Sequence, residues 1–382
     1  MHVVVVGGGI VGLASAHALA TRDVEVTVCE QGSLGNGSTE RSVGGIRSQF
    51  STPVNVALSR ASVEVWERFE NEFGVDIAYR RPGYLFLARE ESTAAGFEEQ
   101  VAMQRGQGVE SELLTPEEAR ERCPELHAGR YRAATYCPTD GFADPHLALQ
   151  GYADACREAG VEVRTKTAVT DVRLADGAAV GVETDGGRVD ADFVVNAAGP
   201  WAARVGAMAG LDLPVSPRRR QVLVTDPDPP VPESVPLTVD LDSGVYFRPE
   251  REGSALVGGH LEDSDDEQDP GAYTKSMDLD WATTAVERAA ETAGYFGPDT
   301  ELKRGWAGLY AVTPDHHPVV EESLPGFVNA VGFSGHGFQH APATGRLVAE
   351  LVCDGAISLV DPVPLSSDRF DRGEGVVERN VA

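Results

Sequence analysis

The chain has 382 residues, 42% of them hydrophobic, and a net charge of -28, so it is long enough for two domains with a sizeable core. The acid excess argues against nucleic acids and anionic membranes as partners, because both need basic patches. Only three of its 32 basic residues are lysine, a bias typical of halophilic proteins. Five dispersed cysteines without a CxxC pair predict reduced thiols in a cytoplasmic protein and no zinc ribbon.

The first 30 residues predict a βαβ unit. The run "HVVVV" (2–6) is a β-branched strand, "IVGLASAHALATR" (10–22) is a helix, and "VEVTVCE" (24–30) is a second strand. The N-terminus is apolar, but it lacks the basic stretch of a signal peptide, and no run reaches the length of a membrane span. We therefore expect neither a signal peptide nor a transmembrane segment.

The rest of the chain alternates between helical and strand patterns. In chain order we expect a helix over 53–73, a strand over 83–90, helices from 116 and over 144–160, a β-meander over 161–199 and more strands over 215–260. The acidic stretch 261–280 lacks the glycine-centred spacing of a calcium loop and predicts a solvated loop. The alternation predicts an α/β domain and a more antiparallel β domain, with the chain crossing between them several times.

A GxGxxG pattern falls at Gly7, Gly9 and Gly12, between the first strand and the first helix. The first glycine permits a tight turn, the second lets the backbone approach a pyrophosphate, and the third lets helix and strand pack closely. Glu30 lies at the end of the second strand, where a carboxylate accepts hydrogen bonds from an adenosine ribose. The pattern predicts a bound dinucleotide without a 2′-phosphate and leaves NAD and FAD open.

Three later segments narrow this choice: "GNGSTERSVGG" (35–45), "VVNAAGPWA" (194–202) and "NAVGFSGHGFQHAPATGRLVAEL" (329–351). With the GxGxxG, they resemble the D-amino-acid-oxidase/glycine-oxidase/sarcosine-oxidase superfamily over about residues 2–355, nearest the sarcosine-oxidase β-subunit and dimethylglycine-dehydrogenase branch. The resemblance implies FAD and an α+β fold. One domain would be a glutathione-reductase-like FAD-binding domain with a Rossmann-type βαβ unit, and the other would carry a mixed or antiparallel sheet.

The resemblance also implies which residues contact FAD. They lie in the GxGxxG turn, at the end of the second strand, in the loop after it, and in the later glycine-rich turns. The expected cofactor-binding residues are Gly7, Gly9, Ile10, Val11, Gly12, Glu30, Gln31, Ser38, Thr39, Ser42, Gly44, Gly45, Val169, Ala198, Gly199, Trp201, Gly308, Gly335, His336, Gly337, Phe338 and Gln339.

On the substrate side, the resemblance places Arg47 where relatives bind the substrate carboxylate, a role that suits a guanidinium fork. The alternative is a solvated arginine on a loop. The turn at His336 faces the flavin in relatives, where N–H groups and a helix dipole stabilise negative charge; a packed structural histidine is the alternative. Gln339 stands where sarcosine oxidases carry a carboxylate-binding lysine. The expected catalytic residues are Arg47, Tyr246, His260, Tyr310, His336 and Gln339.

Two positions depart from the monomeric sarcosine-oxidase pattern. Leu256 stands in place of the lysine that activates oxygen, and Gly308 in place of the cysteine that bonds the flavin. We therefore expect non-covalent FAD and a slow reaction with O2. The "DHHP" sequence at 315–318 does not predict a metal site, because only alternate residues of a strand share a face.

These expectations define a domain plan and an activity. The FAD-binding domain is expected from 1–80, 140–212 and 306–370, the substrate domain from 81–139 and 213–305, and a tail from 371–382. The resemblance implies oxidation of a C–N bond in a small amino acid (sarcosine or another N-methyl, D- or cyclic amino acid), by hydride transfer to flavin N5. The electron acceptor would be O2 or a redox carrier, and a homo- or hetero-oligomer is possible. The alternatives are a 2-hydroxy-acid dehydrogenase and a flavin-binding assembly factor without turnover.

Overall fold

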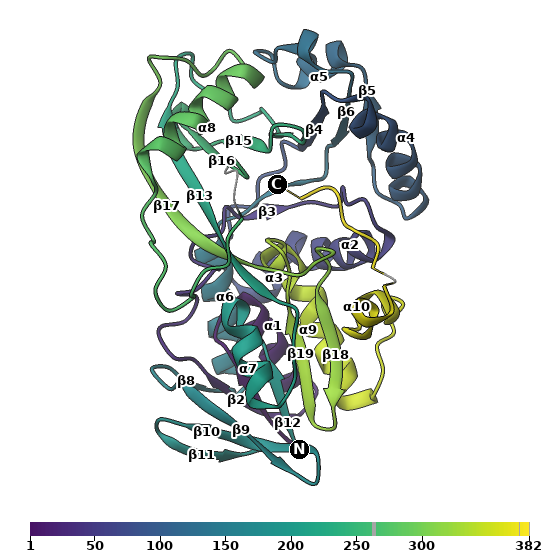
Figure 1. Ribbon diagram of the computed structural model, residues 1–382, viewed down its shortest axis with the longest axis vertical. Coiled ribbons are helices and arrows are strands. Elements are labelled where there is room, and N and C mark those ends of the chain that lie inside the picture. Colours follow the sequence, from purple (N-terminus) through teal and green to yellow (C-terminus); the bar gives the residue numbers. More distant parts are fainter. Residues whose placement is uncertain (262–264, 374, 382) are drawn as a thin grey trace.

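The computed structural model describes residues 1–261, 265–373 and 375–381 (Figure 1). Residues 262–264 of the expected acidic loop, and residues 374 and 382 of the expected tail, lie outside the described residues. Two large sheets organise the molecule, one in its lower half and one in its upper half in Figure 1. Two long strands, β13 (Ser216–Asp226) and β17 (Glu301–Val312), run from the middle of the molecule into the upper half.

The lower sheet has six strands in the order β18-β19-β12-β1-β2-β8. All pairs are parallel except β18 with β19. Their bounds are β18 Val319–Leu324, β19 Phe327–Val331, β12 Phe193–Asn196, β1 His2–Val6, β2 Glu25–Cys29 and β8 Glu162–Arg164. The expected βαβ unit is therefore present, and β1 lies in the middle of the sheet.

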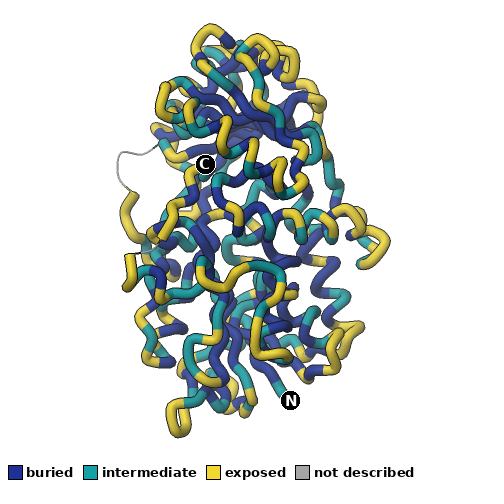
Figure 2. The backbone as a smooth tube through the Cα atoms, turned by 90° about the vertical axis from the view of Figure 1, so that its right-hand side faces the viewer, coloured by how far each residue is buried: buried dark blue, intermediate teal, exposed yellow. Residues whose placement is uncertain are grey.

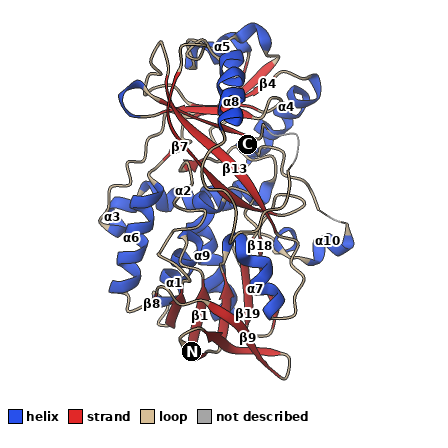
Figure 3. Ribbon diagram, turned by 60° about the vertical axis from the view of Figure 1, so that its left-hand side comes forward, coloured by secondary structure: helices blue, strands red, loops and turns tan. Residues whose placement is uncertain are grey.

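Both faces of the lower sheet are covered, which explains its nearly uninterrupted valines. Val3 and Val5 pack against α1 (Ile10–Ala20), α6 (Pro145–Glu158) and α9 (Gly337–Asp354). Val4 and Val6 point the other way, toward α7 (Ala202–Met208) and a three-stranded antiparallel sheet. That small sheet consists of β9 (Val169–Ala175), β10 (Ala178–Thr184) and β11 (Gly187–Asp190) (Figure 3).

The expected β-meander over 161–199 is only partly present. Its three central strands form the antiparallel sheet just described, but β8 and β12 at its two ends join the parallel sheet. The partners of these two strands, β2 and β1, lie far away in the sequence. The local alternation of strands and turns therefore carried no information about this pairing.

The upper sheet has eight strands in the order β17-β13-β16-β15-β14-β4-β6-β5. The pairing is antiparallel except between β14 and β4, so the sheet is mixed, and the expected α+β fold with two sheets is confirmed. The bounds not yet given are β16 Ala255–Gly259, β15 Val245–Pro249, β14 Leu237–Asp240, β4 Tyr84–Ala88, β6 Ala133–Cys137 and β5 Glu112–Leu114.

One face of the upper sheet is covered by α8 (Leu279–Thr292), whose small alanine face packs on Phe247 and Val257. Further helices, α4 (Glu91–Gly106) and α5 (Pro116–Arg122), lie at the β4–β6–β5 end of the sheet. The opposite face, with Tyr84, Phe86 and Tyr246, points toward the lower half. In Figure 2 buried backbone fills the interior of both halves, and exposed residues lie mostly at the outer surface.

The remaining elements join the two halves. A short pair, β3 (Gly45–Ile46) with β7 (Gly141–Phe142), lies between them. The expected helix over 53–73 is two helices, α2 (Pro53–Glu67) and α3 (Phe69–Phe73), because Arg68 leaves helical geometry. The chain ends with α10 (Asp368–Arg372) and an extended segment. No helix in the described part of the chain is long and apolar enough to cross a membrane.

Candidate active site

A cavity of about 780 Å3 lies between the two sheets, within the size range of small-molecule sites. Its lower wall is formed where β1, β2, β12 and β19 end, including Val6, Cys29 and Ala197. In open parallel sheets, ligands bind beyond the carboxyl ends of the strands at the point where the strand order reverses. Here that point lies at β1, between β2 and β12.

The glycine turn after β1 has no room for side chains. A Cβ on Gly7 would lie 2.5 Å from the carbonyl oxygen of Ala197, and one on Gly12 would lie 2.0 Å from that of Gly7. At Gly9 the nearest atom is the Thr39 hydroxyl at 3.4 Å, so its free side lies along the cavity. Gly7 thus permits the tight turn, Gly12 the close helix packing, and Gly9 the close approach of a dinucleotide pyrophosphate.

The N-terminus of α1 opens onto this cavity without an acidic residue in its first turn and without a side-chain cap at Gly9. Its dipole therefore favours a phosphate there. The Glu30 carboxylate accepts from the N–H groups of Gly8 (2.8 Å) and Gly32 (2.7 Å). A carboxylate has about four acceptor positions, so two remain for ribose hydroxyls.

The loop after β2 lines the cavity beside this turn. Its Thr39 hydroxyl accepts from the N–H of Ile10 at 3.1 Å, and Ser38 donates to the carbonyl of Leu309 at 2.6 Å. Gly45 lies so close to Tyr84 that a Cβ would be 2.1 Å from its hydroxyl oxygen. The loop is thus joined to both halves of the molecule.

At the other end of the cavity, the turn Gly335–His336–Gly337 begins α9, with His336 at the N-cap. Gly335 has a φ of 92°, and a Cβ there would lie 2.4 Å from the ring of Tyr310, so only glycine fits. Burial is the main cause that lowers the pKa of His336 well below its usual value, and the positive charge of Arg47 is the second. His336 is therefore neutral and accepts a hydrogen bond.

Arg47 is buried, with 6% of its surface exposed, and is not the solvated arginine of the alternative interpretation. Its Nη1 donates to the carbonyl of Gln49 at 2.7 Å, and its Nη2 donates to the carbonyl of Asn380 and lies 3.2 Å from Nε2 of His336. Its backbone N–H donates to Oε1 of Gln339 at 2.8 Å. Burial lowers the pKa of the guanidinium, which stays charged because its usual pKa exceeds 12.

These partners of Arg47 are neutral, and no carboxylate among the described residues forms an ion pair with it. The other buried arginine near the cavity, Arg248, is paired with Glu250 at 3.1 Å. The ring of Phe50 lies 4.0 Å from the Arg47 guanidinium carbon. The buried carboxylates of Glu378 and Asp140 lie near enough to raise its pKa, but neither contacts it. A buried guanidinium with no direct carboxylate partner beside a cavity is suited to an anionic ligand.

Three tyrosines complete this end of the cavity: Tyr84, Tyr246 and Tyr310. Burial raises the pKa of each hydroxyl above its usual value, so all three remain protonated donors. None of their hydroxyls hydrogen-bonds another described residue. The wall around them is apolar, with Phe86, Val222, Leu237 and Val239. In the described lining the sole carboxylate is Glu30, at the glycine-turn end.

Most of the predicted site residues line this one cavity. The predicted residues that do are Gly7, Gly9, Ile10, Val11, Glu30, Gln31, Ser38, Thr39, Ser42, Gly45, Arg47, Val169, Ala198, Gly199, Trp201, Tyr246, Gly308, Tyr310, Gly335, His336, Gly337, Phe338 and Gln339. Gly12 lies under the turn, and Gly44 packs on Ala143. His260 is exposed and accepts from Nε of Arg220 at 2.8 Å, and its ring centre lies 6.0 Å from that of Tyr310. The roles of these residues stay predictions.

Sequence reasoning missed Tyr84, Gln49 and Asn380. Tyr84 lies in a run of buried strand residues and resembles ordinary core, and Gln49 follows Arg47 in a segment read as a loop. Asn380 lies 333 residues from Arg47, in a segment expected to be a tail. Local signals for these residues were weak: a glycine precedes Tyr84, and the loop that contains Gln49 is long.

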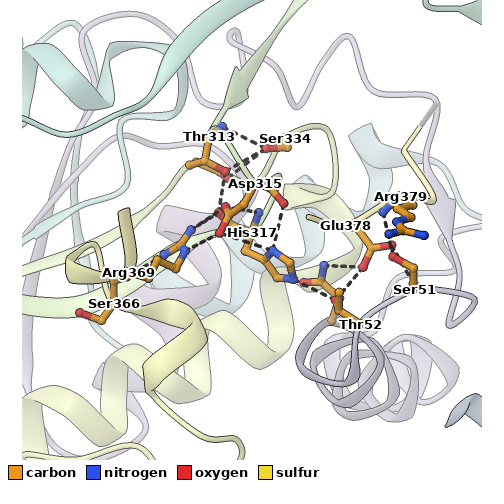
Figure 4. A network of polar contacts seen from close by, with 12 residues as sticks. Ser51, Thr52, Thr313, Asp315, His317, Ser334, Ser366, Arg369, Glu378 and Arg379 are labelled. Atoms are coloured by element: carbon orange, nitrogen blue, oxygen red, sulfur yellow. Dashed lines mark hydrogen bonds and ion pairs between the residues drawn. The ribbon is translucent and has the colours of Figure 1, made fainter. Parts of the chain in front are cut away.

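The "DHHP" residues have a structural role, and Asp315 among them forms a buried ion pair. Asp315 accepts from Arg369 through both carboxylate oxygens, at 2.7 and 3.0 Å, and His317 contacts the Thr52 hydroxyl at 2.9 Å (Figure 4). The described residues contain no group of three or more possible metal ligands close together. These contacts join the turn before β18 to α10 and to the start of α2.

The parallel sheet, the glycine turn and the long cavity between two sheets define a dinucleotide-binding protein of two-sheet architecture. The sequence profile of the family "FAD dependent oxidoreductase" (DAO) matches residues 2–351, so the chain belongs to this family. FAD is accordingly its cofactor, and the cradle of Gly7, Gly9 and Gly12 fits a dinucleotide.

Three similar proteins illustrate the relationship. FAD-dependent oxidoreductase domain-containing protein 1 of Bos taurus is 35% identical, covering 99% of this chain and 86% of that protein. The structure of L-proline dehydrogenase from P. horikoshii is 34% identical, with a TM-score of 0.88, covering 97% and 98%. Mitochondrial dimethylglycine dehydrogenase of Rattus norvegicus is 29% identical, covering 97% of this chain and 45% of that protein. The expected superfamily and branch are confirmed.

Proposed function

We propose that this FAD-dependent oxidoreductase oxidises the C–N bond of a small amino acid that keeps a free carboxylate, with secondary amines such as sarcosine and proline as the leading class. The observation that carries the proposal is the buried guanidinium of Arg47, which forms no ion pair with a described carboxylate and lies beside the apolar wall of the cavity. The similarity to an L-proline dehydrogenase and a dimethylglycine dehydrogenase supports the choice of a secondary or N-methylated amine.

The cavity residues account for binding and orientation. Arg47 would hold the carboxylate, while the apolar wall with Phe86 and Val222 would receive the carbon skeleton. Among the described lining residues, none near Arg47 is a carboxylate that could balance an ammonium, so the amine would bind neutral, with its proton already lost to solvent. Bound FAD supplies the two-electron acceptor for hydride leaving the carbon next to nitrogen. The imine product would then take up water.

The N-terminus of α9 would add electrostatic support. Gly335 and Gly337 bring the helix start to the cavity wall without side chains in the way, and His336 is neutral. The positive end of the helix dipole therefore favours negative charge at that wall. No strong base is required from the chain, and we assign none.

The test is anaerobic mixing of the FAD-loaded protein with sarcosine, dimethylglycine, L- and D-proline, glycine, D-alanine, lactate and glycolate, followed by visible flavin absorbance. We expect one amine class to bleach the flavin and its carboxamide to fail. Bleaching by lactate or glycolate instead would establish a 2-hydroxy-acid dehydrogenase. An unbleached flavin with every compound would contradict an oxidoreductase acting on these substrates. Acid precipitation should release all flavin, because Gly308 offers no thiol for a covalent bond.

A further inference from the structure

The C-terminal segment 375–381 leaves α10 and crosses to the middle of the molecule, between its lower and upper halves (Figure 1). Glu378 and Asn380 are buried, with 0% and 2% exposure, whereas Arg379 between them is exposed. A surface tail does not bury a carboxylate. The burial of two polar side chains on one side of the segment indicates a built contact.

Glu378 anchors the segment at the start of α2. Its carboxylate accepts from the N–H and hydroxyl of Ser51 (2.7 and 2.6 Å), the Thr52 hydroxyl (2.7 Å) and Nδ2 of Asn55 (3.1 Å) (Figure 4 shows part of this network). Burial alone would raise the pKa of Glu378, but the hydrogen bonds from Ser51 and Thr52, together with the nearby charge of Arg47, outweigh it and lower the pKa. The carboxylate is thus ionised at a helix N-terminus, where the dipole also favours it.

Asn380 connects this anchor to the site. Its N–H donates to Glu378 at 3.1 Å, and its Nδ2 donates to the carbonyl of Gln49 and to Oε1 of Gln100 on α4, both at 3.1 Å. Its own carbonyl accepts from Nη2 of Arg47. One residue therefore joins the lower half, the upper half and the guanidinium.

The hydrogen bonds of Arg47 fix its orientation. A guanidinium has five N–H donors. Gln49 takes one on Nη1, and the Asn380 carbonyl and His336 take those of Nη2. The donors that remain are on Nε and Nη1. All three acceptors are neutral, and the nearby carboxylates of Glu378 and Asp140 do not contact the guanidinium, so it is oriented while its remaining donors stay available to a ligand.

We propose that the C-terminal segment is part of the substrate site: Asn380 is a positioning residue that orients Arg47 through its backbone carbonyl, and Glu378 holds Asn380 in place. This inference rests on the carboxylate-binding role proposed for Arg47. It assigns a role in substrate selection to residues that are distant from Arg47 in the sequence. Their loss would weaken the binding of carboxylates and leave the binding of uncharged analogues unchanged.

The test uses full-length, FAD-loaded protein and two small probes, acetate and acetamide, titrated against the visible flavin spectrum. Glu378→Ala and Asn380→Ala remove the anchor and the side-chain contacts of the segment, respectively. Arg379→Ala is the matched control, because its side chain is exposed in the same segment. Glu378→Gln, which keeps the side-chain volume, replaces Glu378→Ala if that variant does not fold. Amino-acid oxidation is measured in parallel.

Removing the Glu378 charge would by itself favour acetate at Arg47, so weaker acetate binding reports the lost orientation of the guanidinium. We expect acetate to bind roughly tenfold or more weakly to both variants, with acetamide binding, flavin content and the Arg379→Ala control unchanged. For amino acids, KM should rise more than kcat falls. Unchanged acetate binding in folded Glu378 and Asn380 variants overturns the inference, even if amino acids are oxidised. Weakened acetate binding supports it even if no amino acid is oxidised, in which case the proposed function fails alone. Equal weakening of acetate and acetamide would also overturn it.

Discussion

The two ends of the cavity are built in different ways. The glycine-turn end consists of backbone: Gly7, Gly9 and Gly12 leave space, and the start of α1 offers its dipole, all within the first 30 residues. The Arg47 end consists of side chains from several distant segments, including β15, β17, α9 and the C-terminal segment. The first end should therefore depend on shape and the second on charge and hydrogen bonding.

The most complete loss, that of the flavin itself, should come from filling the glycine turn. In Gly12→Val, the new Cβ would overlap the Gly7 carbonyl, 2.0 Å away, and overpacking of this kind costs about 1–3 kcal/mol or more. We expect purified Gly12→Val to carry no flavin, measured by absorbance. Gly106→Val is the control, since nothing lies within 4 Å of a Cβ there. A yellow, stable Gly12→Val protein would contradict the shape argument.

The next effect concerns the Arg47 end. Arg47→Ala removes one charge-assisted contact in a buried site, which costs about 2–5 kcal/mol, or roughly a 30- to several-thousand-fold rise in the half-saturating concentration of substrate. The flavin spectrum should stay intact, and Arg47→Lys should recover only part of the loss, because an ammonium cannot form the planar fork.

The control for Arg47 is the substrate itself. The carboxamide of a good substrate should be poor for the native protein and no worse for Arg47→Ala. If both proteins discriminate acid from amide equally, Arg47 is not the carboxylate site. Arg248 would then be tested, although Glu250 already neutralises it.

Low pH should destabilise the Arg47 end of the cavity first. Burial lowers the pKa of His340 to about 3. As the pH falls below about 6.5, the unfolded chain binds a proton at this histidine that the folded chain does not, so stability falls; at pH 5 the loss is roughly 2 kcal/mol. Buried Asp140, whose pKa rises to about 6, acts in the opposite direction over part of this range.

Urea unfolding at pH 7.5 and pH 5 measures this loss. We expect His340→Gln to lose less stability between the two pH values than the native protein. His146→Gln, at an exposed histidine on α6, should lose as much as the native protein does. Identical pH dependence in all three proteins would show that His340 does not couple folding to protons.

The smallest difference between the two ends should come from salt. At a net charge of -28, surface carboxylates repel one another, and salt screens this repulsion over about 10 Å at 0.1 M. We expect the melting temperature to rise with NaCl concentration, with flavin loss and loss of substrate binding shifting together. Full stability in dilute buffer would show that the halophilic interpretation is wrong.

The same contrast explains what could be read from the sequence. Gly7, Gly12 and Glu30 are close together in the chain, and the spacing between them is typical of a dinucleotide-binding βαβ unit. The Arg47 end was reached through family resemblance, which supplied Tyr310, His336 and Gln339 in the cavity lining and His260 outside it, and their roles stay predictions. Nothing local in "VVERN" indicates that Asn380 meets Arg47. The parallel pairing of β8 and β12 was hidden for the same reason.

The central position of β1 has a cost during protein synthesis. β2 follows it closely, but its other neighbour is β12, and the bond from the His2 N–H to Asp192 spans 190 residues. At about 5–20 residues per second, a ribosome needs about 10–40 s to deliver that neighbour. For that time the nascent chain presents an open, valine-rich strand edge of the kind that recruits other chains. Protection by chaperones should therefore matter most while the first half of the chain is being made.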